Sequence, residues 1–247
     1  MSVDVEIRDG VMIITLNRPE AANALNAAVG KGLVDAFTAA TDDPNVRSII
    51  VTGAGEKIFC AGMDLKAFAA GEDISLVAAG MNILTSCPKP IIAAVNGHAL
   101  AGGFEVMMKC DLVVAAENAR FGIPEVKRGL VAAGGGTRLP RRIPLQVALE
   151  MGLTGEPISA ERAKELGLVN RVVPAADVLD TALGLAALIN ANGPLAVQAT
   201  KQLMIEEIGP DTAAHVGKAT AHVFMSEDAR EGATAFAEKR APVWKGR

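Results

Sequence analysis

Residues 91–105 constrain the fold more than any other stretch, because an apolar run meets a glycine-rich junction and a helix there. The run Ile91 to Val95 has no polar side chain, which predicts a strand buried on both faces. The junction Asn96 to Gly103 leads into helix-forming residues from Phe104. Glycines let a ligand approach the backbone, and the first N–H groups of a helix lack partners within it. The junction therefore favours binding of an anion or of a developing oxyanion.

Glu105 lies in the first turn of this expected helix. One interpretation is structural, since an acidic side chain near a helix N-terminus complements the helix dipole. The other is that the carboxylate is a catalytic group beside the free N–H donors. The junction by itself is compatible with both interpretations.

The rest of the chain alternates apolar strands with amphipathic helices, which predicts an α/β fold with a parallel sheet. From Leu145 onward the pattern is mostly helical. Expected strands are residues 3–7, 11–16, 46–52, 91–95, 111–116 and 169–173, with residues 121–122 as a short one. Expected helices are residues 21–40, 64–69, 71–86, 159–166, 175–190, 194–207, 211–224 and 226–236.

Composition narrows the function classes. Half of the 247 residues are apolar, the net charge is −4, and no basic run is longer than Arg141-Arg142, which argues against nucleic-acid binding. The longest apolar stretch, Ile91 to Phe104, is interrupted by polar residues and too short for a membrane span. Three cysteines without zinc spacing, and a start without an export signal, predict reduced thiols, no metal site and a cytoplasmic location.

Three segments combine glycines at element junctions with charged residues. They are Phe59 to Lys66, Asn96 to Glu105, and Phe121 to Leu139. Each is weak evidence alone, but their order and spacing together are specific. With Arg18-Pro19 and Asn23-Ala24-Leu25 upstream, the sequence closely resembles the crotonase superfamily of enoyl-CoA hydratases and isomerases.

The resemblance covers nearly the whole chain and implies the family's architecture. That architecture is a crotonase (ClpP-like) spiral of β-β-α units followed by a helical C-terminal trimerisation region. We expect residues 1–192 to form the spiral core with the active site, and residues 193–247 to form the trimerisation region. The resemblance also implies a homotrimer or a hexamer built as a dimer of trimers.

The resemblance assigns roles to four residues. The backbone N–H groups of Met63 and Gly102 would form an oxyanion hole for the thioester carbonyl, and such donors stabilise the charge that develops there. Glu105 and Glu125 fall where the hydratases carry two catalytic carboxylates. Without the resemblance, Glu125 could equally be an acidic residue at a helix N-terminus after Pro124.

Weaker matches concern the coenzyme A part of the substrate. Ala21 and Ala61 match backbone positions near it, Lys66 matches a lysine near its phosphates, and Phe236 and Lys239 match C-terminal contacts. For the lysines, a solvated surface charge is an equally good explanation. No separate cofactor is expected, because coenzyme A belongs to the substrate.

The expected activity is addition of water to a trans-2-enoyl-CoA, giving a 3-hydroxyacyl-CoA. Both glutamates favour this lyase chemistry, because one carboxylate can activate water while the other transfers a proton. Two other crotonase reactions are the nearest alternatives: double-bond isomerisation and dehydration of a carnitinyl-type CoA ester. A different class of alternative is a non-catalytic acyl-CoA-binding subunit, in which both glutamates would be dispensable.

Overall fold

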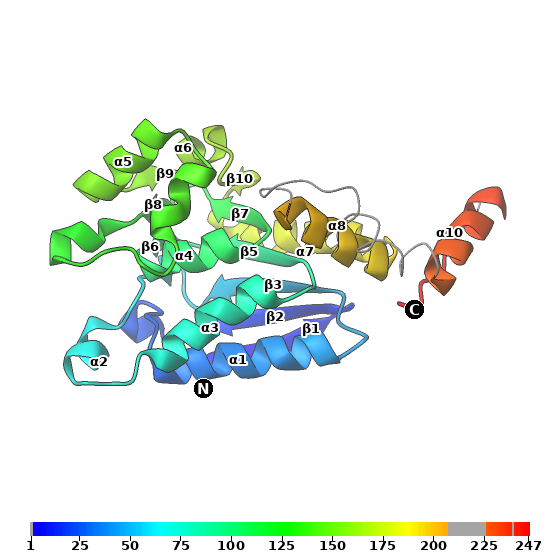
Figure 1. Cartoon of the computed structure of the whole chain (residues 1–247), viewed down its shortest axis with the longest axis horizontal. Helices are drawn as coiled ribbons and strands as arrows, with labels where there is room; N and C mark the ends of the chain where they lie inside the picture. The colour runs from blue at the N-terminus through cyan, green and yellow to red at the C-terminus, as the bar shows by residue number, and fades with distance from the viewer. Residues whose placement is uncertain (1, 207–225, 239) are drawn as a thin grey trace.

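The computed structural model describes residues 2–206, 226–238 and 240–247. In this part of the chain a large sheet forms the centre of the molecule (Figure 1). Its neighbours pair in parallel except at β1, which is antiparallel to β2. In spatial order its strands are β1 (Val3–Arg8), β2 (Val11–Leu16), β3 (Ser48–Gly53), β5 (Ile91–Val95), β7 (Leu112–Ala116) and β10 (Arg171–Val173).

A second, smaller sheet makes the fold a spiral. Each of three central strands of the large sheet is followed by a short strand of the small sheet and then by helical residues. The clearest unit is β5, β6 (His98–Leu100) and α4 (Gly102–Lys109). The expected spiral of β-β-α units is therefore confirmed. The other strands of the small sheet are β4 (Ile58–Cys60), β8 (Arg120–Gly122) and β9 (Ile158–Ser159).

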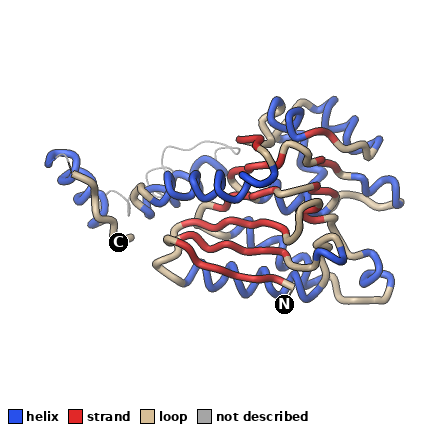
Figure 2. The backbone as a smooth tube through the Cα atoms, turned by 180° about the vertical axis from the view of Figure 1, so that it is seen from behind, coloured by secondary structure: helices blue, strands red, loops and turns tan. Residues whose placement is uncertain are grey.

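Helices cover both faces of the large sheet (Figures 1 and 2). α1 (Ala27–Asp42) and α3 (Ser75–Ser86) lie on one face, and α7 (Val178–Asn190) packs against β3, β5 and β7 on the other. The remaining helical elements are η1 (Pro19–Ala21), α2 (Leu65–Ala69), η2 (Pro124–Arg128), η3 (Gly136–Arg141), α5 (Leu145–Thr154), α6 (Ala160–Glu165), η4 (Ala175–Asp177), α8 (Pro194–Glu206) and α10 (Glu227–Glu238).

Two predicted helix starts are wrong. The helix expected from residue 21 begins at Ala27, where Asn26 caps it by accepting a hydrogen bond from the Val29 N–H at 3.0 Å. Pro19–Ala21 form η1, and Leu25 pairs with Met63 instead of joining the helix. The helix expected from residue 71 begins at Ser75. The helix expected at residues 211–224 lies outside the described residues.

The sequence also predicts a direct passage from the strand at 91–95 to a helix at about 104, and the structure differs. A short strand, β6, intervenes, and α4 already begins at Gly102. The turn between β5 and β6 is tied to the neighbouring turn of the spiral by the Asn96 side chain. Its amide Nδ2 donates to the carbonyls of Gly53 at 2.8 Å and Gly55 at 2.6 Å. Asn96 therefore holds successive turns of the spiral in register.

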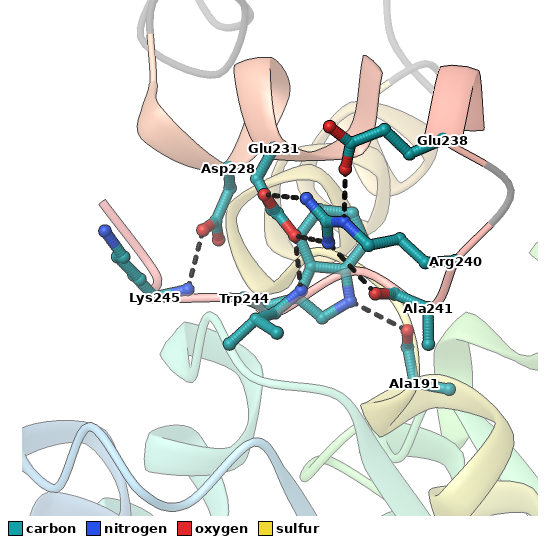
Figure 3. Close-up of polar contacts among 9 residues, drawn as sticks. Ala191, Asp228, Glu231, Glu238, Arg240, Ala241, Trp244 and Lys245 are labelled. Carbon is teal, nitrogen blue, oxygen red and sulfur yellow. Dashed lines mark hydrogen bonds and ion pairs between the residues drawn. The ribbon is translucent and has the colours of Figure 1, made fainter. Parts of the chain in front are cut away.

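The C-terminal segment, residues 226–238 and 240–247, lies at the far end of the molecule from α2. It contacts the core through Trp244 (Figures 1 and 3). The Trp244 indole N–H donates to the carbonyl of Ala191, just after α7, at 2.8 Å. Within the segment, Arg240 forms an ion pair with Glu231 on α10, and the Lys245 N–H donates to Asp228. These contacts attach α10 and the tail to one another.

Within the described ranges, no single helix is long and apolar enough to cross a membrane. One pair of helical segments, Ala175–Asn190 and Pro194–Ile205, passes that test jointly by length and composition, with a bend of 107° between them. The first segment contains α7, whose Val178, Ala182 and Ala186 are buried in the core.

α1 and α3 cross at unusually short range, and two glycines permit it. A Cβ on Gly30 of α1 would overlap the Leu76 carbonyl of α3, and a Cβ on Gly80 of α3 would lie 2.6 Å from the Gly30 carbonyl oxygen. Interiors are close-packed, so neither position has room for a methyl group. This crossing fixes α3, which forms one wall of the cavity described below.

Gly30→Ala is expected to destabilise the protein, because its methyl group must push α1 and α3 apart, which typically costs about 1–3 kcal/mol. Gly184→Ala in α7 is the matched control: no atom lies within 4 Å of its Cβ position. Alanine is the better helix former, so this control is expected to be stabilising by about 0.5–1 kcal/mol. Urea unfolding measures both, and equal effects of the two substitutions would contradict the close crossing.

Candidate active site

A cavity of about 1100 Å³ opens between α3, α4 and the loops that follow β4 and β8. Its walls are mainly apolar, with polar groups at a few places, as is usual for small-molecule sites. Apolar side chains from four different segments form the walls, among them Leu25, Met63, Val77, Met81 and Leu130.

Two backbone N–H groups meet at this cavity, those of Met63 and Gly102. Both residues line the cavity, and the Cβ position of Gly102 lies 3.5 Å from the Met63 nitrogen. Gly102 is the first residue of α4, where a helix leaves its N–H groups unpaired. Among the described residues neither N–H has a hydrogen-bond acceptor. The predicted pair of donors therefore lies side by side.

The two donor loops touch through glycines. Gly62 has a φ of +91°, and its Cβ position would be 2.7 Å from the Gly102 nitrogen. A Cβ on Gly103 would overlap the Cys60 carbonyl. Any larger residue at either position would separate the loops. These glycines set the distance between the two N–H groups, which is the geometric requirement of an oxyanion hole.

The Met63 loop is held in place from the other side by Leu25. The Leu25 N–H donates to the Gly62 carbonyl at 2.8 Å, and the Asp64 N–H donates to the Leu25 carbonyl at 2.9 Å. Asp64 also caps α2, accepting from the Lys66 and Ala67 N–H groups at 3.2 Å. These two N–H bonds leave the intervening Met63 N–H free to face the cavity.

Arg18 and Asp64 form a half-buried ion pair behind this loop that the sequence analysis did not identify as functional. Their side chains are 3.0 Å apart, and Arg18 also donates to the Ala24 carbonyl at 2.7 Å. The hydrogen bond from the Ala67 N–H lowers the pKa of Asp64 below its usual value, and the hydrogen bond from Arg18 lowers it further. The only sequence signal was the occurrence of both residues within the resemblance segments.

Glu105 is buried, with 4% of its surface exposed, on the cavity side of α4. Its Oε1 accepts a hydrogen bond of 2.7 Å from the Gly136 N–H. A Cβ on Gly134 would overlap the other oxygen, Oε2. The glycine-rich loop thus packs directly on the carboxylate. This arrangement is more than a dipole partner needs, since an exposed acid would serve that purpose.

Glu125 lies in η2, directly after Pro124, and reaches the same cavity. Its Oε2 is buried and has no hydrogen-bond partner among the described residues. Burial raises the pKa of Glu125, a backbone hydrogen bond partly offsets this, and the negative charge of Glu105 raises it further. The two predicted carboxylates therefore influence one another across one cavity.

Not all of the remaining residues predicted to contact coenzyme A line the cavity. Ala61 lines it, and its N–H donates to the Ala22 carbonyl at 3.1 Å. Ala21 ends η1 and is half-buried, while Lys66 is exposed on α2. Neither is among the residues that line the cavity. The Phe236 side chain and Lys239 lie outside the described residues.

Three cations line the cavity that the sequence analysis did not single out: Lys109, Arg128 and Arg138. Lys109 ends α4, and Arg138 belongs to η3. Lys109 lies one helical turn beyond Glu105, a spacing that was visible in the sequence. Its position near a helix C-terminus has an ordinary structural explanation in the helix dipole, so the spacing alone carried no signal for a site.

Fold and site together define a class of protein. A β-β-α spiral presents two converging N–H donors and two carboxylates at one apolar cavity, which suits an enzyme that builds negative charge on a carbonyl oxygen and moves protons nearby.

Comparison with known proteins places the chain within that class. Residues 6–247 match the model of the enoyl-CoA hydratase/isomerase family. The chain is 43% identical to a carnitinyl-CoA dehydratase of Proteus mirabilis, covering 100% of this chain and 99% of the relative. It is 41% identical to an (E)-benzylidenesuccinyl-CoA hydratase of Thauera aromatica, covering both chains completely. The crystal structure of an enoyl-CoA hydratase from Mycobacterium tuberculosis superposes with a TM-score of 0.95 at 52% identity, covering 100% and 99% of the two chains. The protein belongs to the enoyl-CoA hydratase/isomerase family.

The raised pKa of Glu125 predicts how the free energy of unfolding depends on pH. An unfolded glutamate titrates at about 4.3, below the folded value. Between the two pKa values the native state binds more protons than the unfolded state, so the free energy of unfolding falls as pH rises through that window. Glu125→Gln removes this fall in the free energy of unfolding, because glutamine does not titrate. The stability of the variant relative to the native protein is therefore expected to increase across the window and then level off.

Urea unfolding at several pH values and one protein concentration measures this difference. Glu161→Gln, on the exposed face of α6, is the control and should show no such increase. A difference for Glu125→Gln that does not change with pH would contradict the raised pKa.

Proposed function

We propose that this protein adds water to a trans-2-enoyl-CoA to give a 3-hydroxyacyl-CoA, or catalyses the reverse reaction. The observation that carries the proposal is the meeting of Met63 N–H, Gly102 N–H, Glu105 and Glu125 at one cavity. Family membership supports an acyl-CoA thioester as the substrate.

In the hydration direction, the thioester oxygen accepts hydrogen bonds from Met63 and Gly102. Glu105, as the carboxylate, takes a proton from water while the water oxygen bonds to C3. The π electrons move toward C2 and the carbonyl, and the oxyanion hole stabilises the enolate charge. Glu125, whose pKa is raised, then delivers a proton to C2. One water is consumed, and each glutamate regains its starting state by proton exchange.

Dehydration of a carnitinyl-type CoA ester is a second candidate, favoured by the relatives that carry that name. It would run the same steps in reverse on a different acyl group. Isomerisation would move a double bond without consuming water, and a non-catalytic subunit would bind acyl-CoA without turnover. Product analysis separates all four, because only hydration converts the conjugated enoyl group into a 3-hydroxy product.

We propose further that Ala21, Ala61, Lys66, Phe236 and Lys239 contact coenzyme A, and that no separate cofactor is needed. Residues 1–192 would form the catalytic core, and residues 193–247 would assemble it into trimers or hexamers. Light scattering that gives a monomer mass would contradict the assembly. Loss of turnover after dialysis against a chelator would contradict the absence of a metal. Measured affinities of Lys66→Ala and Lys239→Ala for coenzyme A test the contacts.

The free thiols support a cytoplasmic location. Cys60, Cys87 and Cys110 are all buried and unpaired by disulfides. Proteins of oxidising compartments commonly pair such residues. Burial raises the pKa of Cys60 to about 12, so this thiol is inert rather than catalytic. Cell fractionation that recovers the protein outside the cytoplasm would contradict this location.

Glu105→Gln and Glu125→Gln are each expected to lower kcat for enoyl-CoA hydration by about 10²–10⁴, the usual effect of removing a general acid or base. The double variant is expected to lose much less than the product of the two effects, because the two glutamates act as a unit on the same addition of water. Loss of the conjugated enoyl absorbance measures the rate, and calorimetry measures substrate binding.

Glu117→Gln, beyond the end of β7 and exposed, is the control and should keep native kinetics. Substrate binding should persist in all variants, since the glutamine is isosteric. Native turnover in both glutamate variants would exclude the proposed mechanism. Binding without turnover in the native protein, across short, long and branched enoyl groups, would favour a non-catalytic subunit.

A further inference from the structure

The cavity has two chemically different ends, and α4 connects them. Gly102, Glu105 and Lys109 all line the cavity, and their spacing of three and four residues puts them on one face of the helix. A rise of about 1.5 Å per residue places Lys109 about 10 Å along the axis from Gly102. A substrate whose carbonyl lies at Gly102 therefore passes Glu105 before it reaches Lys109.

α3 runs along the opposite wall and confirms the position of that far end. Its residues Val77, Met81 and Thr85 line the cavity at intervals of four, again one helix face. The Lys109 ammonium donates to the Thr85 hydroxyl at 3.5 Å, close to the end of α3. The walls thus change from apolar side chains near the oxyanion hole to a hydroxyl and an ammonium at the far end.

The far end carries positive charge that the described residues do not neutralise. Lys109 and Arg138 take part in none of the ion pairs formed among those residues, and neither does Arg128, which lines the same cavity. In the described part of the chain, Glu105 and Glu125 are the acids that line the cavity. Burial lowers the pKa of Lys109 most, and the charge of Arg138 lowers it further, while the charge of Glu105 partly offsets both effects. Arg138 therefore lies close enough to Lys109 to repel it.

A structural role does not account for this arrangement. The helix dipole favours Lys109 at the end of α4, but Arg138 comes from a separate segment, η3. Two neighbouring cations in a partly desolvated cavity destabilise each other, and such a cost is recovered when an anion binds between them. The expected occupant is therefore an anionic group on the molecule that fills the cavity.

We propose that this end binds a carboxylate, so that the preferred substrate is a 2-enoyl-CoA whose acyl group ends in a carboxylate. The inference rests on the proposed function, since it assigns the acyl group of that same reaction. Arg138 suits a carboxylate because its planar guanidinium can donate two parallel hydrogen bonds, and Lys109 adds a point charge. A quaternary ammonium, as in a carnitinyl group, would meet like charge at this end.

The same cations could instead bind a phosphate of coenzyme A, which is also an anion. The two sources differ in their experimental signature. Every CoA ester carries the phosphates, so a phosphate contact affects all substrates alike. A carboxylate contact affects only substrates that carry the carboxylate. The position of Lys109 favours the carboxylate, because Lys109 lies beyond Glu105 from the oxyanion hole along α4.

The experiment compares oct-2-enoyl-CoA with oct-2-enedioyl-CoA, which differ only in the terminal carboxylate. The native protein is expected to prefer the dicarboxylic ester by roughly 10–100-fold in kcat/KM, the effect of a charge-assisted hydrogen bond of about 1.5–3 kcal/mol. Lys109→Met and Arg138→Met should each reduce this ratio toward one. Arg141→Met, an exposed cation on the same η3 outside the cavity, should leave the ratio unchanged.

Charge reversal provides a second arm. Arg138→Glu should turn the preference toward a 2-enoyl-CoA that carries a terminal trimethylammonium group. Turnover of the neutral ester reports that each variant is folded, so a changed ratio in an active variant is a change in selectivity.

Three outcomes would overturn the proposal. A native ratio near one, with the neutral ester hydrated, would exclude the carboxylate site and leave the proposed function intact. Equal losses for both esters in the two methionine variants would assign the cations to the CoA phosphates. Native preference for the trimethylammonium ester would identify a carnitinyl-type substrate. Failure to hydrate any ester would instead contradict the proposed function itself.

Discussion

The site depends on the contact between two loops that are far apart in sequence, Cys60 to Gly62 and Ala101 to Gly103. Their backbones can touch because Gly62 and Gly103 have no Cβ atom. A Cβ at either position would overlap or crowd the opposite loop. The contact puts the Met63 and Gly102 N–H groups side by side. It also fixes the start of α4, and with it the place where Glu105 enters the cavity. Donor geometry and acid placement thus come from a single packing constraint.

The two carboxylates share a cavity but not an environment, and this difference suits their chemistry. Glu105 accepts a hydrogen bond from the Gly136 N–H. The buried Oε2 of Glu125 has no such partner in the described part of the chain, and burial favours its neutral form. In the mechanism that we propose, Glu105 accepts a proton from water, and Glu125, whose pKa is raised, donates one to the substrate.

The sequence predicted correctly those elements whose burial pattern is visible in their own residues. Prediction failed where contacts with distant segments determine the secondary structure. The strand Ile91–Val95 was predicted at its observed bounds, since a run buried on both faces is visible in the residues themselves. The helix start at residue 21 was wrong, because Leu25 is drawn into pairing with Met63, a contact that helix propensity cannot reveal. β6 was missed because its three residues gain their strand pairing only from β4 and β8. The predicted donors and both glutamates meet at the cavity, but Ala21 and Lys66 do not line it.

Lys109 shows why the acyl group of the substrate could not be predicted from the sequence alone. A lysine at a helix C-terminus is common and needs no ligand to explain it. Its meaning changes only when η3, folded back over α4, brings Arg138 into the same cavity. In the reaction that we propose, the two N–H donors and the two glutamates act on the part of the substrate that all enoyl thioesters share, so they cannot select among acyl groups. Under our proposal, selection comes from the far end of the cavity, which α3, α4 and η3 line and where Lys109 and Arg138 lie.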